Sequence, residues 1–143
     1  MPQIMLNAII HSMNITYRKA EKNDLDQVMK VIRDAQATLK EDGVDQWQDG
    51  FPDEKVILED MSVRSAFVIL VDGSVSGFFV LAFGIEPDYV NPVRGAFKNN
   101  EPYAAIHRTA ISKDCKGKGL SQFMFQSAFD EIKKAGIDYA RID

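Results

Sequence analysis

The sequence has one cysteine, five prolines and no long apolar run. Because Cys115 stands alone, no disulfide can form within the chain, and the clustered cysteines of structural zinc sites are missing. No apolar stretch approaches the roughly 20 residues that a membrane-spanning helix needs. These absences exclude a disulfide-rich secreted domain, and we expect a protein with no bound metal and no membrane partner.

The sequence also has fewer basic residues than acidic ones. Lys and Arg total 17 against 21 Asp and Glu, which gives a net charge of −4 and argues against nucleic acid as a partner. Residues 1–12 lack the basic start and the small-residue cleavage site of a signal peptide, so we expect a cytoplasmic protein. Hydrophobic residues make up 45% of the chain and charged residues 27%, as is usual for a globular domain.

The chain reads as an N-terminal extension, residues 1–13, followed by one domain, residues 14–143. Alternating side chains predict strands, and apolar side chains three or four residues apart predict helices. The predicted elements are a strand over 14–19, a helix between Asn23 and Gly43, a helix over 53–64, strands over 65–71 and 74–85, a loop over 86–101, a strand over 104–111, a helix over 120–135 and a strand over 137–142. This order, β-α-α-β-β-β-α-β, indicates an α+β domain with a mixed β-sheet and helices on both of its faces.

Three local signals refine this prediction. Asn23 is expected to cap the first helix, with Asp26 three residues further on. The dipeptide Asp72-Gly73 predicts a tight hairpin between two antiparallel strands. The last strand, helix and strand form a β-α-β unit, whose two strands should be parallel and joined by a right-handed crossover.

The most informative segment is the turn between the strand over 104–111 and the helix that follows it. Gly117 and Gly119 stand there between lysines, which allows consecutive backbone N–H groups to converge at the positive end of a helix. Such a turn suits a phosphate or a pyrophosphate. A glycine pair at a strand-to-helix turn can also serve the turn alone, and the known nucleotide-binding patterns do not match this one.

The element order and the turn Lys116-Gly117-Lys118-Gly119-Leu120-Ser121 together resemble the GNAT family of acetyl-CoA-dependent N-acetyltransferases. The family signature is Gln/Arg-x-x-Gly-x-Gly/Ala. Gly119 matches it, whereas Lys116 replaces Arg or Gln and Ser121 replaces Gly or Ala. Lysine keeps the positive charge without the guanidinium fork, and serine remains small. The resemblance implies a GNAT-like fold, acetyl-CoA as cosubstrate and transfer of an acetyl group to an amine, either a small molecule or a protein.

The resemblance also implies where acetyl-CoA binds. The backbone amides of the turn would hold the pyrophosphate, and the edge of the preceding strand would bind the pantetheine arm as though it were another strand. The residues assigned to cofactor binding in this way are Thr109, Ala110, Ile111, Lys116, Gly117, Lys118, Gly119, Leu120 and Ser121.

For the acceptor and the catalytic groups, the resemblance leaves alternatives. The loop over 45–52 lies where relatives bind the acceptor, although Trp47 can instead cover the core of the helix pair. Glu101 is a candidate general base acting through water, or else a surface glutamate. His107 is a candidate proton relay on the strand face that also carries Tyr103, Ala105 and Thr109, or else a packed structural histidine. We interpret Cys115 as a bystander near the pyrophosphate.

Family members usually continue with a further helix and strands, so we interpret the chain as C-terminally truncated. Three functions then compete: an N-acetyltransferase, a catalytically impaired CoA-binding remnant, and a non-catalytic module that associates with itself. The last of these predicts a homodimer in which the apolar segment over 4–10 covers the exposed sheet.

Overall fold

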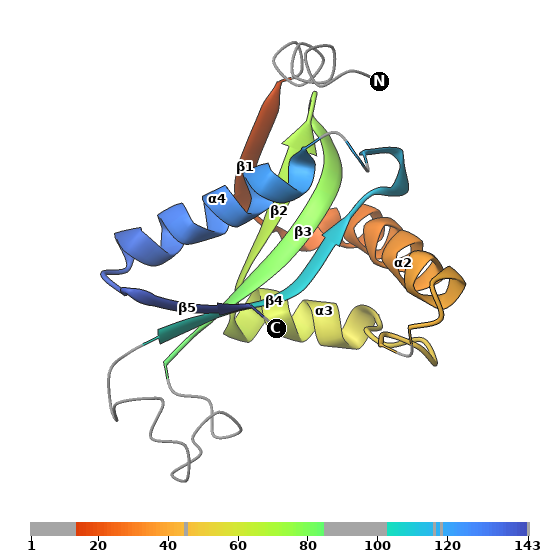
Figure 1. Cartoon of the computed structure of the whole chain (residues 1–143), viewed down its shortest axis with the longest axis horizontal. Coiled ribbons are helices and arrows are strands. Elements are labelled where there is room, and N and C mark those ends of the chain that lie inside the picture. The colour runs from red at the N-terminus through yellow and green to blue at the C-terminus, as the bar shows by residue number, and fades with distance from the viewer. Residues whose placement is uncertain (1–13, 45, 85–102, 116, 118, 143) are drawn as a thin grey trace, which may run out of the picture.

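A computed structural model describes residues 14–44, 46–84, 103–115, 117 and 119–142 of the chain. A single five-stranded sheet has the strand order β1-β2-β3-β4-β5 (Figure 1). Neighbouring strands are antiparallel as far as β4, and β5 lies parallel to β4. The predicted extension over 1–13 and the predicted loop over 86–101 lie outside the described residues.

The predicted order of helices and strands is confirmed, with end points within a few residues of those expected. The elements are β1 (Ile15–Lys19), the short 3-10 turn η1 (Lys22–Asp24), α2 (Leu25–Glu41), α3 (Glu54–Val63), β2 (Ser65–Val71), β3 (Ser74–Phe83), β4 (Tyr103–Ile111), the 3-10 turn η3 (Lys113–Cys115), α4 (Leu120–Lys134) and β5 (Tyr139–Ile142). No helix in this described part is long and apolar enough to pass through a bilayer.

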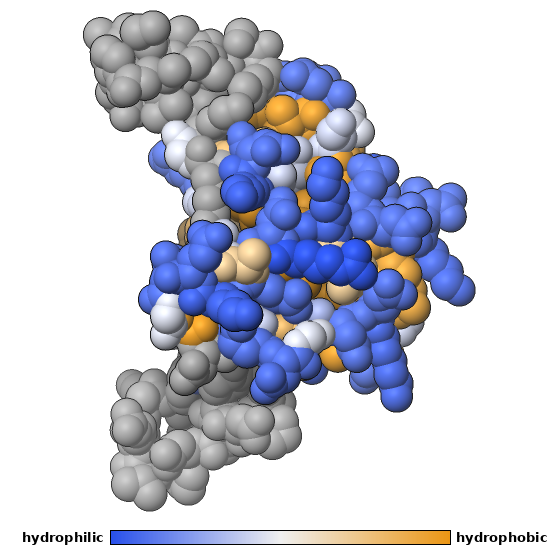
Figure 2. Space-filling model, turned by 90° about the vertical axis from the view of Figure 1, so that its right-hand side faces the viewer, coloured by the Kyte–Doolittle hydropathy of each residue, from blue (hydrophilic) through white to orange (hydrophobic). Residues whose placement is uncertain are grey.

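Each face of the sheet buries its own apolar core. Helices α2 and α3 pack on one face, where Ile32 and Ile57 meet Phe78 of β3. Helix α4 crosses the other face, where Leu120 and Met124 pack against the side of β3 that carries Phe79 (Figure 1). Neighbouring residues of a strand point to opposite faces, so a continuous apolar run suits a strand covered on both sides. The surface is mostly hydrophilic on the side shown in Figure 2, with apolar side chains in separate patches.

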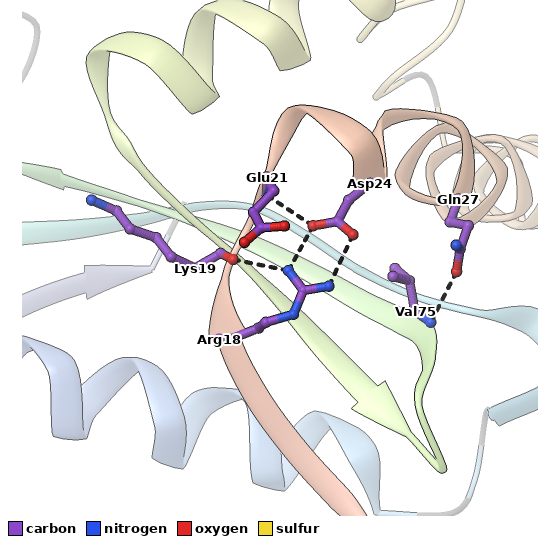
Figure 3. A network of polar contacts seen from close by, with 6 residues as sticks. All are labelled: Arg18, Lys19, Glu21, Asp24, Gln27 and Val75. Atoms are coloured by element: carbon purple, nitrogen blue, oxygen red, sulfur yellow. Dashed lines mark hydrogen bonds and ion pairs between the residues drawn. The ribbon is translucent and has the colours of Figure 1, made fainter.

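The start of α2 differs from its prediction. Asn23 lies inside η1, and a capping box joins Glu21 and Asp24 instead, with the Glu21 amide donating to Asp24 at 2.8 Å. Arg18 of β1 donates to both carboxylate oxygens of Asp24, at 2.7 and 3.0 Å (Figure 3). These hydrogen bonds from Arg18 hold the pKa of Asp24 below its usual value. The prediction that Asn23 caps this helix is therefore wrong. The Asp24 carboxylate, which also accepts hydrogen bonds from the Arg18 guanidinium, forms the stronger contact.

A β-bulge interrupts β4 where it pairs with β3. Phe78 lies opposite Ala110 and Val80 opposite His107, so Phe79 alone faces both Arg108 and Thr109. The extra residue shifts the alternation of side chains by one. Ala110 therefore joins the core that contains Val80, and the prediction that Thr109 shares a face with His107 is wrong.

Candidate functional site

A cleft of about 800 Å³ lies between α2, the loop that follows α2, strand β4 and the start of α4. Several segments that are far apart in the sequence meet in it. Its lining residues are Ala35, Thr38, Leu39, Gln46, Trp47, His107, Arg108, Thr109, Ala110, Ile111, Cys115, Gly117, Gly119, Leu120, Ser121, Gln122, Met124 and Phe125. The cleft thus brings together most of the site residues that the sequence predicted.

The glycine turn forms one wall of the cleft and leads directly into α4. Gly117 and Gly119 have φ values of 77° and 78°, in the left-handed region that favours glycine. Gly119 is the N-cap of α4, no side-chain hydrogen bond caps the helix, and its first turn has no acidic residue. The backbone N–H groups of the first helical turn are therefore available to an anion at the positive end of the helix. Lys116 and Lys118 lie outside the described residues.

The second half of β4 offers an open edge to the cleft. Strand β5 pairs only with Tyr103–Ile106 of β4. Within the described part of the chain, no strand continues this pairing beside Thr109, Ala110 and Ile111, all of which line the cleft. An extended ligand can therefore add its own amide groups to this edge, as a further strand would.

The loop between α2 and α3 closes the cleft on another side. Trp47 is half-buried, packs against the core shared by α2 and α3, and lines the cleft as well. Trp47 thus covers the core of the helix pair, and it also faces the cleft. Side-chain amides tie the loop to α2: Gln48 donates to the Gln36 carbonyl at 3.4 Å, and Gln36 donates to the Pro52 carbonyl at 3.3 Å.

The two candidate catalytic residues have different outcomes. His107 is half-buried and lines the cleft on the same strand as the open edge. Glu101 lies outside the described residues.

Cys115 is half-buried, packs against the core under α4 and also lines the cleft. No group of His, Cys, Asp and Glu side chains that would suit a metal ion occurs among the residues with a described position.

The sequence reasoning missed a charged pair at the bulge. Asp60 of α3, whose side chain is 3% exposed, forms an ion pair with Nε of Arg108. Nε of Arg64 lies 3.9 Å from the other carboxylate oxygen of Asp60, and the Arg108 guanidinium lies 5.5 Å from the centre of the Phe51 ring. One signal was present: Asp60 follows Ile57 by three residues, which places an acid on the apolar stripe of α3.

A second hollow, of about 670 Å³, lies on the α4 side of the sheet. Tyr17 donates a hydrogen bond to Glu131 at 3.1 Å, and Lys134 lies 3.5 Å from the same carboxylate oxygen. Burial, together with Glu131, raises the pKa of Tyr17, which keeps this phenol protonated. None of the predicted site residues with a described position lines this hollow, so the first cleft is the candidate site.

Comparisons with known proteins concern the family and the fold of the whole chain. Residues 31–142 match the model of the Acetyltransferase (GNAT) family. A GNAT family acetyltransferase from Streptococcus agalactiae is 30% identical, with a TM-score of 0.71 over 82% of this chain and 69% of that chain. A predicted acetyltransferase from Clostridium acetobutylicum, solved with acetyl-CoA, is 15% identical, with a TM-score of 0.62 over 91% of this chain and 80% of that chain.

A third similar structure is an aminoglycoside acetyltransferase from an uncultured soil metagenomic sample, solved in complex with sisomicin. It is 14% identical, with a TM-score of 0.61 over 90% of this chain and 76% of that chain, a likeness that concerns the fold. The comparison with curated proteins gives no match. The family model covers most of the chain, and a relative of 30% identity has the same fold. The chain therefore belongs to the GNAT family of acetyltransferases.

Proposed function

We propose that the cleft binds acetyl-CoA and that the protein transfers the acetyl group to the nitrogen of an amine. The observation that carries this proposal is the uncapped start of α4 beside the open edge of β4. Gly117 supports the fit, because no described atom other than those of its chain neighbours lies within 4 Å of where a Cβ would be, which leaves room for a ligand at its backbone. A cleft of about 800 Å³ is within the range usual for cofactor sites.

The residues of the turn and the strand would divide the binding between them. The amides of Gly119, Leu120 and Ser121 would donate to the pyrophosphate, with the Ser121 hydroxyl exposed beside them. The side chain of Leu120 is buried in the core, so only its backbone takes part. Thr109 to Ile111 would hydrogen-bond the pantetheine arm along the open edge. When bound, acetyl-CoA supplies an activated thioester for attack by the amine.

His107 would handle the proton of the attacking amine. An ammonium has no free electron pair, so the amine must lose a proton before or during its attack. A neutral imidazole on the cleft wall can accept this proton, directly or through one water. Glu101, which precedes β4 in the chain, is the second candidate for this role.

A second candidate function is self-association, and exposed apolar side chains around β5 favour it. Tyr139 and Ile142 are each 57% exposed, and Phe129 of α4 is 39% exposed. A homodimer formed there would bury these side chains and the edge of the sheet. We expect Ile142→Ser to lower the apparent mass measured by light scattering if this surface joins two copies.

Thermal unfolding with and without acetyl-CoA tests the proposed function first. Ligand at about one hundred times its dissociation constant should stabilise the fold by about 2.7 kcal/mol. Release of the CoA thiol in the presence of an amine panel then tests transfer. Stabilisation without thiol release would indicate a CoA-binding protein without transferase activity, and no stabilisation would refute the cofactor site.

A further inference from the structure

Arg108 has an unusual backbone for its residue type. Its φ is 54°, in the left-handed region that long side chains rarely adopt, and it lies in the bulge of β4. Strained residues persist where the surrounding structure holds them, and they gather at functional sites. Here Asp60 of α3 holds the guanidinium from one side and the Phe51 ring lies on another. The bulge therefore fixes one arginine in the wall of the cleft.

The guanidinium of Arg108 keeps donors for a ligand. Nε faces Asp60, and the side chain is 21% exposed where it lines the cleft. Asp60 also faces Arg64, so one carboxylate is shared between two guanidinium groups. Asp60 accepts from Nε and the Phe51 ring lies beside the guanidinium, and within the described residues no hydrogen bond engages the Nη atoms of Arg108. These Nη atoms suit a carboxylate, which a guanidinium binds through paired hydrogen bonds.

The rest of the cleft wall indicates which acceptors fit. Among the described residues that line it, Arg108 carries the permanent charge and none is acidic. A polycationic acceptor would find no carboxylate on this wall. Trp47 offers an apolar surface nearby, and Gln46 and Thr38 offer polar groups.

We infer that the acceptor amine also bears a carboxylate, as an α-amino acid does, and that Arg108 binds this carboxylate in the part of the cleft formed by β4 and the loop between α2 and α3. This inference rests on the proposed function, because it assigns the acceptor of the same cleft. Arg108 would select the acceptor and orient its amine, while the turn before α4 binds the cosubstrate.

Calorimetry with the CoA-saturated protein tests the inference without requiring turnover. The probes are L-leucine, L-phenylalanine and L-methionine, each compared with its own amide, and spermidine as the polycation. We expect at least one amino acid to bind about tenfold or more tightly than its amide and than spermidine. Equal binding of every acid and amide, or tighter binding of spermidine, would overturn the inference.

Variants connect this selectivity to Arg108. Arg108→Gln should bring the ratio of acid to amide affinity close to 1, and Arg108→Lys should retain part of it because the charge remains. Arg64→Gln is the matched control, since it removes the same charge from the other partner of Asp60, and it should keep the wild-type ratio. Selectivity that survives Arg108→Gln in a folded protein would contradict the assignment.

The failure of this inference and the failure of the proposed function give different results. CoA that stabilises the wild-type protein while acids and amides bind equally would leave the proposed function intact and remove the role of Arg108. If CoA itself does not bind, the proposed function fails, and the same titrations of the CoA-free protein still decide whether the cleft selects a carboxylate. If Arg108→Gln does not fold, the ratio of acid to amide affinity is compared between the wild-type protein and Arg108→Lys. An equal ratio in these two proteins would contradict the role of Arg108.

Discussion

Helices α3 and α4 begin in opposite ways. Asp53 caps α3 by accepting a hydrogen bond from the Val56 amide at 3.0 Å, and Glu54 adds an acidic side chain to the first turn. Gly119 begins α4 with a left-handed φ, no capping side chain and no acid in the first turn. The first arrangement satisfies the free N–H groups and the dipole from within the chain, while the second leaves them open.

This difference separates a helix start that stabilises the fold from one that can bind a ligand. Helix α2 has no capping hydrogen bond from the side chain of its N-cap Asp24, but the turn η1 with its Glu21–Asp24 capping box leads into it and Asp26 adds an acidic side chain to its first turn. Helix α4 is also the helix whose start lines the cleft. The chain places acidic side chains in the first turns of α2 and α3 and none in the first turn of α4, so it forgoes some stability at the place where we propose that an anion binds.

The largest expected effect comes from closing the open start with a carboxylate. Gly117→Asp places a negative charge where the pyrophosphate would bind, and we expect the affinity for CoA to fall by about 100-fold or more, equivalent to about 2.7 kcal/mol. Calorimetry measures this loss. Gly136→Asp is the matched control, since Gly117 and Gly136 have φ values of 77° and 76° and neither has an atom within 4 Å of an added Cβ.

Both variants force a strained backbone on an aspartate, so both unfolding temperatures should fall, and that of Gly136→Asp should fall further because its carboxylate meets the negative end of α4. Only the variant in the cleft should lose CoA. A Gly117→Asp protein that is folded and binds CoA as tightly as the Gly136→Asp protein would contradict the assignment of the anion site to the start of α4.

A smaller effect is expected at Cys115, which lines the cleft and is the only cysteine of the chain. Saturating CoA should slow its alkylation by iodoacetamide by about tenfold, because the ligand covers the approach to Sγ; a tenfold effect corresponds to about 1.4 kcal/mol. The reaction of free N-acetylcysteine with the same reagent, with and without CoA, is the control. Equal alkylation rates of Cys115 in the two conditions would place the ligand elsewhere.

A variant at the capped start of α3 should lower stability and leave the affinity for CoA unchanged. Asp53→Ala removes the acceptor for the Val56 amide and should lower the free energy of unfolding by about 1 kcal/mol. Because α3 starts away from the glycine turn, the affinity for CoA should not change. Urea unfolding and calorimetry measure the two quantities, and a loss of CoA affinity in this variant would contradict the division between the two helix starts.

The smallest expected effect concerns pH and the start of α2. The pKa of Asp24 is lowered in the folded protein, so its carboxylate stabilises the fold above the unfolded pKa of about 3.9, and this contribution is lost as the pH falls through the lower, folded pKa. Asp24→Asn should therefore lower stability at pH 7 by less than about 1 kcal/mol, because Arg18 is partly exposed. The free energy of unfolding of this variant should also depend less on pH below about 5 than that of the wild-type protein. The same dependence on acid pH in both proteins would contradict this prediction.

The sequence was sufficient to predict features that depend on near neighbours. Apolar residues with a regular period defined the helices and strands, Asp72-Gly73 predicted the hairpin between β2 and β3, and the crossover rule predicted that β5 is parallel to β4. The glycine turn was identified because glycine favours a positive φ regardless of what surrounds it. Each of these predictions depends on a preference that a short segment expresses by itself.

Only the tertiary structure decided the details that join distant segments. The bulge in β4 depends on its pairing with β3, so no local pattern showed that Thr109 changes face or that Arg108 adopts a positive φ. The ion pair of Asp60 and Arg108 joins residues 48 positions apart, and the place of Asp60 on the apolar stripe of α3 does not by itself name its partner. The sequence by itself determined the elements and the glycine turn, because those follow from local propensity, whereas the bulge in β4 and the ion pair with Asp60 of α3 placed the arginine in the cleft.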